Sequence, residues 1–200
     1  MEKLTTGDGS ITLYSEKYQE YFHTKSGALE ESFEKFAKPC NLKPGAEILD
    51  IGFGLGYNIL AAMCSANHIK IISLEKDKTV LEEAQSLEVP ERLKKYFEII
   101  KKAAKNLHYK DENFEIRIIL GDASETIKTI NEKFDAVFLD PFSPSKNPEL
   151  WTAEFFRDVK KLMKDKAVLA TYSYARLVRD NLKKAGFQVK DGPIIGRRSP

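Results

Sequence analysis

A cluster of glycines and a carboxylate stands near the end of the first quarter of the chain. A short apolar segment ending at Ile51 contains Asp50 and runs into three glycines at alternate positions, Gly52, Gly54 and Gly56. Glycine lets the backbone bend sharply and approach a ligand without a Cβ in between. The residues that follow are good helix formers, and the first turn of a helix presents free N–H groups. Strand, glycine turn and helix together predict a binding site for a nucleotide-like ligand.

The spacing of the glycines distinguishes between two kinds of cofactor. A dinucleotide fingerprint, G-x-G-x-x-G, requires glycine at position 57, where this chain has Tyr57. The pattern present, D-x-G-x-G-x-G, is typical of class I S-adenosylmethionine-dependent methyltransferases, in which the turn lies against the methionine end of the cofactor. We therefore expect S-adenosylmethionine as the cofactor, bound by Asp50, Gly52, Phe53, Gly54 and Gly56. A glycine turn without a ligand and an NAD site are the alternatives.

A second carboxylate follows the next predicted strand. Glu75 directly follows the apolar segment 68–74 and lies 23 residues after Gly52. A carboxylate at this place accepts hydrogen bonds from a ribose diol. We expect Glu75, with the neighbouring Lys76, to bind the cofactor, and prefer Glu75 to Asp77 because Glu75 is nearest the strand end.

A third carboxylate, Asp122, follows the strand predicted over 115–120 and is itself followed by Ala123. In this fold a side-chain carboxylate here usually bonds the adenine amino group, so both residues are candidate cofactor contacts. Asp122 is equally suited to cap the helix predicted from about Ser124. Both functions remain open for Asp122.

A fourth carboxylate, Asp140, directly follows the strand predicted over 135–139. It begins the run Asp140-Pro141-Phe142-Ser143-Pro144. Prolines limit the backbone freedom around Asp140, and ligands bind at the carboxyl ends of parallel strands. The run resembles the D/N-P-P-Y-type motif of amine-modifying methyltransferases, which receives hydrogen bonds from the target nitrogen. Asp140 is therefore the predicted catalytic residue and also a cofactor-side contact. A simple Asp-Pro turn is the alternative.

These groups require a sheet that brings successive strand ends to one edge. We predict an α/β fold, a Rossmann-like doubly wound sheet of the class I methyltransferase type, over 26–200, after a small β-rich extension over 1–25. The final strand of the sheet is not evident at the C-terminal end. Further predicted elements are helices over 27–38, 78–86, 149–164 and 174–185, a helix opening at Pro90, and strands over 167–172 and 187–189.

Composition narrows the class of protein. Two hundred residues, 42% of them hydrophobic, suffice for one domain with a sizeable core. No apolar run has the length of a membrane helix, and residues 1–5 contain no apolar signal-peptide core. Two widely spaced cysteines predict a reducing, cytoplasmic setting, and no histidine or cysteine spacing suits a metal. Residues 156–200 carry a net charge of +8 and residues 1–155 a net charge of −6, which suggests either an RNA-binding surface or ordinary solvated helix faces.

Several motifs together resemble the methyltransferase domain of the MnmC-type tRNA wobble-uridine modification enzymes. The most specific is the stretch from Phe138 to Thr152, which reads F-L-D-P-F-S-P-S-K-N-P-E-L-W-T. The segments 8–14, 27–31, 50–58, 73–77, 121–123, 170–173 and 185–187 extend the likeness over nearly the whole chain.

The resemblance implies methylation of the exocyclic amine of 5-aminomethyl-uridine, often 2-thiolated, at the tRNA wobble position, with tRNA as partner. It implies the stand-alone form without the oxidase domain, so that another enzyme supplies the aminomethyl intermediate, with no membrane and no metal involved. Candidate substrate contacts are Tyr21, Phe142, Lys146, Asn147 and Trp151. Packing is the alternative for each of these, and for Trp151 it is slightly favoured. Methylation of a small-molecule amine and a non-catalytic RNA-binding domain are the alternative functions.

Overall fold

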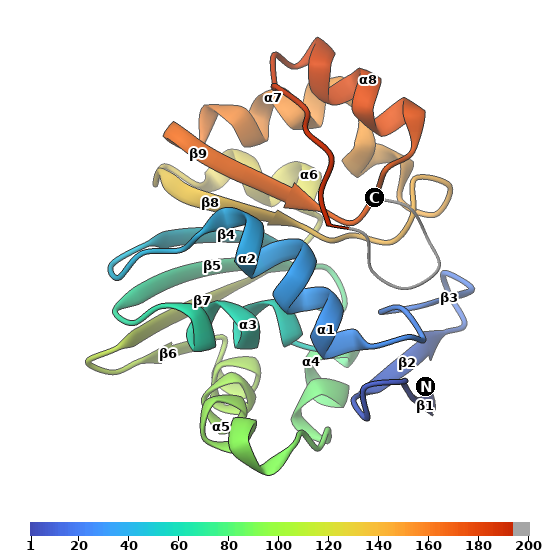
Figure 1. Cartoon of the computed structure of the whole chain (residues 1–200), viewed down its shortest axis with the longest axis vertical. Helices are drawn as coiled ribbons and strands as arrows, with labels where there is room; N and C mark the ends of the chain where they lie inside the picture. The colour runs from blue at the N-terminus through green and yellow to red at the C-terminus, as the bar shows by residue number, and fades with distance from the viewer. Residues whose placement is uncertain (194–200) are drawn as a thin grey trace.

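The centre of the molecule is a six-stranded sheet, whose strands lie one below the other in the middle of Figure 1. The computed structural model describes residues 1–193. Neighbouring strands are parallel except for the β6–β7 pair, which is antiparallel. In spatial order the strands are β6 (His108–Lys110), β7 (Phe114–Leu120), β5 (Ile69–Glu75), β4 (Glu47–Ile51), β8 (Phe134–Leu139) and β9 (Met163–Thr171). The chain order reverses at β4, and such a switch point opens a crevice at the carboxyl ends of the strands.

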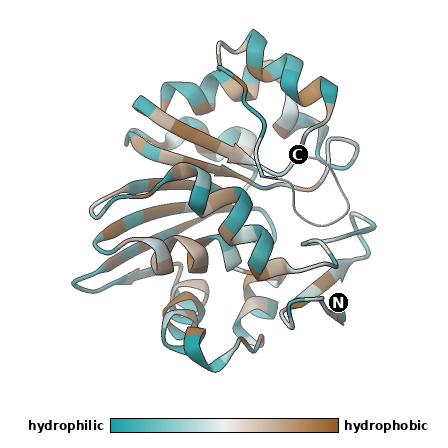
Figure 2. Cartoon of the chain, viewed as in Figure 1, coloured by the Kyte–Doolittle hydropathy of each residue, from teal (hydrophilic) through white to brown (hydrophobic). Residues whose placement is uncertain are grey.

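Helices cover both faces of the sheet, as predicted for a doubly wound fold (Figure 1). One core contains residues of α1 (Ala28–Glu31), α3 (Tyr57–Ser65), α4 (Lys78–Gln85) and α5 (Glu91–Asn106), and the other contains residues of α6 (Ala123–Thr126), α7 (Ala153–Lys161) and α8 (Arg176–Lys184). Side chains alternate across a strand, so Ile48 of β4 joins the first core and Leu49 the second. Hydrophobic residues concentrate in the strands, while the outer helix faces are hydrophilic (Figure 2). Within 1–193, no helix is both long and apolar enough to cross a membrane.

Residues 1–25 form a separate three-stranded antiparallel sheet of β1 (Glu2–Thr5), β2 (Ile11–Ser15) and β3 (Glu20–Tyr21). The turn between β1 and β2 binds the start of α1, because Asp8 Oδ2 accepts the Glu30 N–H at 2.9 Å and Ser10 Oγ accepts the Ala28 N–H at 3.1 Å. The Tyr57 hydroxyl also donates to the Ile11 carbonyl at 2.8 Å. The extension is therefore fixed onto the main domain.

Three predicted helices differ from the structure. The helix predicted over 149–164 is a 3-10 turn, η3 (Pro148–Trp151), followed by α7, because the Thr152 side chain caps a new helix at the Phe155 N–H. The helix predicted over 27–38 is α1, a π-helical segment η1 (Ser32–Ala37) and α2 (Lys38–Cys40). A short 3-10 turn, η2 (Ile127–Thr129), extends α6.

The strand predicted over 187–189 is absent from the described part of the chain. Phe187 donates its N–H to the Leu182 carbonyl at the end of α8, and its ring packs on the second core, so it does not pair with β9. The incomplete last strand inferred near the C-terminus falls mostly on residues 194–200, which lie outside the described residues. The antiparallel strand β6, which was not predicted, lies at the opposite edge of the sheet.

Gly56 provides a test of the packing beneath the glycine turn. It has a φ of 81°, and a Cβ placed on it would lie 2.6 Å from Ile100 Cγ2. Gly56→Ala should destabilise the protein by about 2–4 kcal/mol, since left-handed strain and overpacking add. Exposed Gly45 has a φ of 84° with no atom within 4 Å of such a Cβ, so Gly45→Ala should show only the strain. Equal losses in urea unfolding would contradict the packing argument.

Candidate active site

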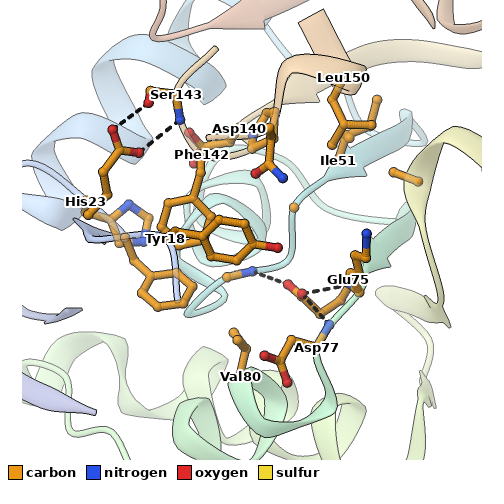
Figure 3. Close-up of a pocket in the computed structure, with 18 of the residues that line it drawn as sticks. Tyr18, His23, Ile51, Glu75, Asp77, Val80, Asp140, Phe142, Ser143 and Leu150 are labelled. Atoms are coloured by element: carbon orange, nitrogen blue, oxygen red, sulfur yellow. Dashed lines mark hydrogen bonds between the residues drawn. The ribbon is translucent and has the colours of Figure 1, made fainter. Parts of the chain in front are cut away.

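A cavity of about 530 Å³ lies where the strand ends of the central sheet face the N-terminal sheet (Figure 3). Its size is in the range of small-molecule and cofactor sites. Ten of the residues predicted from the sequence line it. They are Tyr21, Gly52, Gly54, Glu75, Lys76, Asp122, Ala123, Asp140, Phe142 and Asn147.

The glycine turn joins three strand ends at the cavity floor. Gly52 has a φ of 97°, and a Cβ on it would lie 2.8 Å from the Asp140 carbonyl oxygen. Only glycine therefore allows the turn after β4 to lie this close to the loop after β8. The Gly54 N–H donates to Glu75 Oε2 at 3.1 Å, which ties the same turn to the end of β5.

Glu75 is held by the backbone around it. Its Oε1 accepts the N–H groups of Lys76 and Asp77 at 2.8 and 2.9 Å, in addition to the Gly54 bond to Oε2 (Figure 3). Burial raises the pKa of this carboxyl, and the three N–H donors oppose the rise. A carboxylate offers about four acceptor positions, so Glu75 is oriented at the cavity with acceptor capacity left for a ligand hydroxyl.

Asp122 and Lys76 form an ion pair at the cavity wall, with 2.6 Å between Lys76 Nζ and Asp122 Oδ2. Asp122 also caps α6, because its Oδ1 accepts the Ser124 N–H at 3.0 Å. The hydrogen bond from Lys76, aided by Ser124, lowers the pKa of Asp122 to about 2. The capping function left open by the sequence is thus present, and Asp122 lines the cavity together with Ala123 as well.

Asp140 stands at the end of β8 with its N–H bonded to the Ile51 carbonyl. Its Oδ2 accepts a hydrogen bond of 2.7 Å from the amide of Asn58 on α3. Burial raises the pKa of Asp140 well above its ordinary value. The nearby charges of Glu31 and Asp50 raise it further, whereas Asn58 and Lys35 lower it. A carboxyl with a raised pKa is a competent proton acceptor for a basic substrate.

The N-terminal extension supplies the opposite wall, of which the sequence analysis had assigned only Tyr21 to the site. Glu20 accepts hydrogen bonds from the Ser143 N–H at 3.0 Å and the Ser143 hydroxyl at 2.5 Å. Tyr18 stacks on Phe142 with 4.2 Å between ring centroids (Figure 3). Phe22 meets Phe142 edge-on at 5.0 Å. One face of Phe142 is therefore already covered by protein. The crowding of aromatics before residue 25 was the available signal.

Two further lining residues were missed, His23 and Glu31. His23 is 8% exposed, and its Nε2 has no hydrogen-bond partner within 1–193. Burial lowers the pKa of His23 to about 4, although the charges of Glu31 and Asp8 oppose the change. The imidazole is consequently neutral at physiological pH.

Five predicted site residues do not line the cavity: Asp50, Phe53, Gly56, Lys146 and Trp151. The rings of Phe53 and Trp151 are core residues, 2% and 1% exposed, and Trp151 Nε1 donates to the Phe142 carbonyl at 2.9 Å beneath the loop. Gly56 packs against α5, as described above. We therefore assign these three to support of the site rather than to ligand contact.

Asp50 is fully buried behind the glycine turn. Ser73 Oγ donates to Asp50 Oδ2 at 2.6 Å, while Asp50 Oδ1 has no partner among the described residues. Burial raises the pKa of Asp50 to about 7, with a further contribution from the charge of Glu75, whereas the Ser73 bond lowers it. The charge of Asp50 affects the site by raising the pKa of Asp140.

Lys146, the remaining predicted residue, lies half-buried on the loop after β8.

The sheet order, the glycine turn after β4, the carboxylate after β5 and the acidic loop after β8 define a class I S-adenosylmethionine-dependent methyltransferase. The residues present fit the cofactor, because the oriented Glu75 carboxylate and the Cβ-free cradle at Gly52 and Gly54 face one cavity. Within 1–193, no group of three or more histidine, cysteine or acidic residues could hold a metal ion.

Comparison with known proteins agrees with this class. Residues 84–200 match the sequence model of a family described as S-adenosyl-L-methionine-dependent methyltransferase. The crystal structure of MnmC2 from Aquifex aeolicus superposes with a TM-score of 0.88 at 36% identity, covering 99% of this chain and 68% of that one. The chain belongs to the family of MnmC-type S-adenosyl-L-methionine-dependent methyltransferases.

Two curated relatives are longer than this chain. An uncharacterised protein of Methanocaldococcus jannaschii is 34% identical over 96% of this chain and 56% of its own length. The tRNA 5-methylaminomethyl-2-thiouridine biosynthesis bifunctional protein MnmC of Leptospira interrogans is 29% identical over 98% of this chain and 34% of its own length. The chain thus spans about half of the first relative and a third of the second.

The buried imidazole of His23 should make stability depend on pH. Its pKa is about 4 in the folded protein against an ordinary value near 6.5, so the unfolded chain binds the proton first as the pH falls. Between about pH 6.5 and 4, the wild type should lose up to about 1.4 kcal/mol per pH unit relative to His23→Gln. Urea unfolding at several pH values measures the difference. If the free energies of unfolding of the two proteins changed in parallel with pH, a lowered pKa for His23 would be contradicted.

Proposed function

We propose that this protein methylates the exocyclic primary amine of 5-aminomethyl-uridine, with or without 2-thiolation, at the wobble position of tRNA. The observation that carries the proposal is Asp140, a half-buried carboxylate that lines the cavity beside the glycine turn and has a raised pKa. The likeness to relatives named for 5-methylaminomethyl-2-thiouridine biosynthesis, over 98% of this chain, supports the substrate. A separate reaction has to supply the aminomethyl group.

The cofactor contacts follow from the cavity lining. Gly52 and Gly54 would lie against the methionine end, Glu75 would accept hydrogen bonds from the ribose diol, and Asp122 and Ala123 would meet the adenine. When bound, S-adenosylmethionine supplies an electrophilic methyl group on a sulfonium. The task of the protein is then to align the nucleophile and exclude water.

Asp140 acts on the substrate nitrogen. An alkyl ammonium has no lone pair, so one N–H proton must leave before the nitrogen attacks. The Asp140 carboxylate accepts that proton, and its raised pKa makes the transfer less uphill. The N–C bond then forms as the C–S bond breaks, and the positive charge passes from sulfur to the methylated nitrogen. Orientation of the nitrogen by Asp140 is the larger contribution.

The wobble nucleotide would enter from the side of the N-terminal sheet and the loop after β8. Tyr21, Phe142 and Asn147 line the cavity there and suit the stacking and hydrogen bonding of an unstacked base. Lys146, on the same loop, suits a phosphate contact.

Methyl transfer from labelled S-adenosylmethionine to tRNA lacking the final wobble methyl tests the proposal. The wild type should label the wobble uridine, and Asp140→Asn should lower kcat by about 10²–10⁴-fold while retaining cofactor affinity. Labelling of free amines but of no tRNA would favour the small-molecule alternative, and binding of S-adenosylmethionine without any transfer would favour a non-catalytic domain.

Glu75 gives a separate test of cofactor placement. Glu75→Gln should weaken S-adenosylhomocysteine binding by about ten-fold or more, because a charge-assisted acceptor is lost and an NH₂ group faces backbone N–H donors. Asp77→Asn is the matched control, since asparagine also caps α4 through the Thr79 N–H. Isothermal titration calorimetry measures both. A larger loss in Asp77→Asn would shift the ribose contact to Asp77.

A further inference from the structure

Glu31, the last residue of α1, reaches the cavity although it is only 8% exposed. Its Oε2 accepts the Thr24 N–H at 3.0 Å, and its Oε1 lies 3.4 Å from Lys35 Nζ one turn further along the helix. The carboxylate is thus fixed from two sides, and the π-helical segment η1 begins at the next residue. Such segments are frequent at functional sites.

The charge of Glu31 reaches several groups of the cavity. It raises the pKa of Asp140, raises that of the Tyr172 phenol, and opposes the burial-driven lowering at His23. Tyr172 donates its hydroxyl to the Pro141 carbonyl at 2.9 Å, next to Asp140 in the chain. Glu31, Asp140 and Tyr172 all line the cavity, so Glu31 shares it with the catalytic carboxylate.

A second, independent feature at this end points to a ligand. The His23 ring lines the cavity and is more than nine-tenths buried, yet its Nε2 has no partner among the described residues. A buried polar atom without a partner costs free energy unless a ligand satisfies it. Because the ring is neutral at physiological pH, one of its nitrogens is an acceptor.

We propose that Glu31 is a second anionic group of the amine site, which together with Asp140 and His23 binds the substrate nitrogen as a primary ammonium group. The inference rests on the proposed function and adds a specificity-determining residue to it. A primary ammonium has three N–H donors and no acceptor, which matches two carboxylates and one imidazole nitrogen. A hydroxyl substituent has one donor and no charge, so the site discriminates against it.

Glu31 also serves the transfer step electrostatically. When Asp140 takes a proton from the ammonium, the nitrogen becomes neutral and the negative charge of the carboxylate pair stays on Glu31, which Lys35 Nζ contacts at 3.4 Å. That charge faces the nitrogen as the N–C bond forms, the C–S bond breaks and positive charge develops on the nitrogen. A fixed charge aimed at developing charge stabilises the transition state without reorganisation.

Binding without turnover tests the inference. The probes are an anticodon stem-loop RNA with 5-aminomethyl-uridine at the wobble position and the same RNA with 5-hydroxymethyl-uridine, each with S-adenosylhomocysteine present. The wild type should prefer the aminomethyl RNA by about ten- to a hundred-fold. Glu31→Gln, which keeps an acceptor for the Thr24 N–H, should lose most of this preference, and Glu31→Asp should restore part of it. Glu30→Gln, an exposed neighbour on α1, should behave as the wild type.

A full preference in Glu31→Gln, or none in the wild type, would overturn the inference. Its failure is distinguishable from failure of the proposed function. If tRNA is methylated but Glu31→Gln keeps the preference for the aminomethyl RNA, only the inference about Glu31 is wrong. If that preference depends on Glu31 but no tRNA is methylated, the inference about the amine site is supported and the proposed wobble substrate is wrong.

The pH profile of kcat/KM gives a readout that a merely structural role would not move. Asp140 is faced by Glu31 of α1, Lys35 of η1, Asp50 of β4, Asn58 of α3 and Tyr172 after β9. Because Glu31→Gln removes a negative neighbour, the acid limb of the profile should move to lower pH, while Glu30→Gln should leave it in place. An unmoved limb in Glu31→Gln would show that Glu31 does not act on the amine site.

Discussion

The close approach of two loops is the constraint on which the rest of the site depends. The turn after β4 lies against the backbone after β8, with no room for a Cβ between Gly52 and the Asp140 carbonyl. The same turn bonds to Glu75 at the end of β5. Three neighbouring strands of one parallel sheet therefore fix the positions of the acidic side chains relative to one another, and a shift in any strand would move them all.

The cavity is divided electrostatically. At the cavity wall just after β7, the carboxylate of Asp122 forms an ion pair with Lys76, and this contact keeps the carboxylate ionised. At the opposite end, burial raises the pKa of Asp140, and the charges of Glu31 and Asp50 raise it further. No ion pair comparable to that of Lys76 and Asp122 compensates Asp140 within the described residues. One end thus suits a neutral, hydrogen-bonding ligand part, and the other suits a cation that arrives with a proton to give.

The sequence predicted what depends on local pattern. The strand-ending Glu75 and Asp140 and the turn glycines Gly52 and Gly54 were found because strand, turn and spacing are read from neighbouring residues. The motif did not indicate which of its side chains face inward, so Phe53 was expected at the ligand, although its ring is in the core. For Trp151, the slightly favoured alternative of packing agrees with its burial. The Thr152 side chain caps α7 and so divides the single helix that was predicted over 149–164. Glu31 and His23 reach the cavity through tertiary packing, which no local pattern encodes.

The bond between Glu20 and Ser143 spans 123 residues of the chain, and this separation has a consequence for biosynthesis. As the protein leaves the ribosome, the β1–β3 sheet emerges long before the loop that completes its side of the cavity. During that interval Tyr18, in the turn between β2 and β3, has no Phe142 ring to stack on. Long-range closure of this kind is slow, so this wall of the cavity should be among the last parts of the newly made protein to assemble.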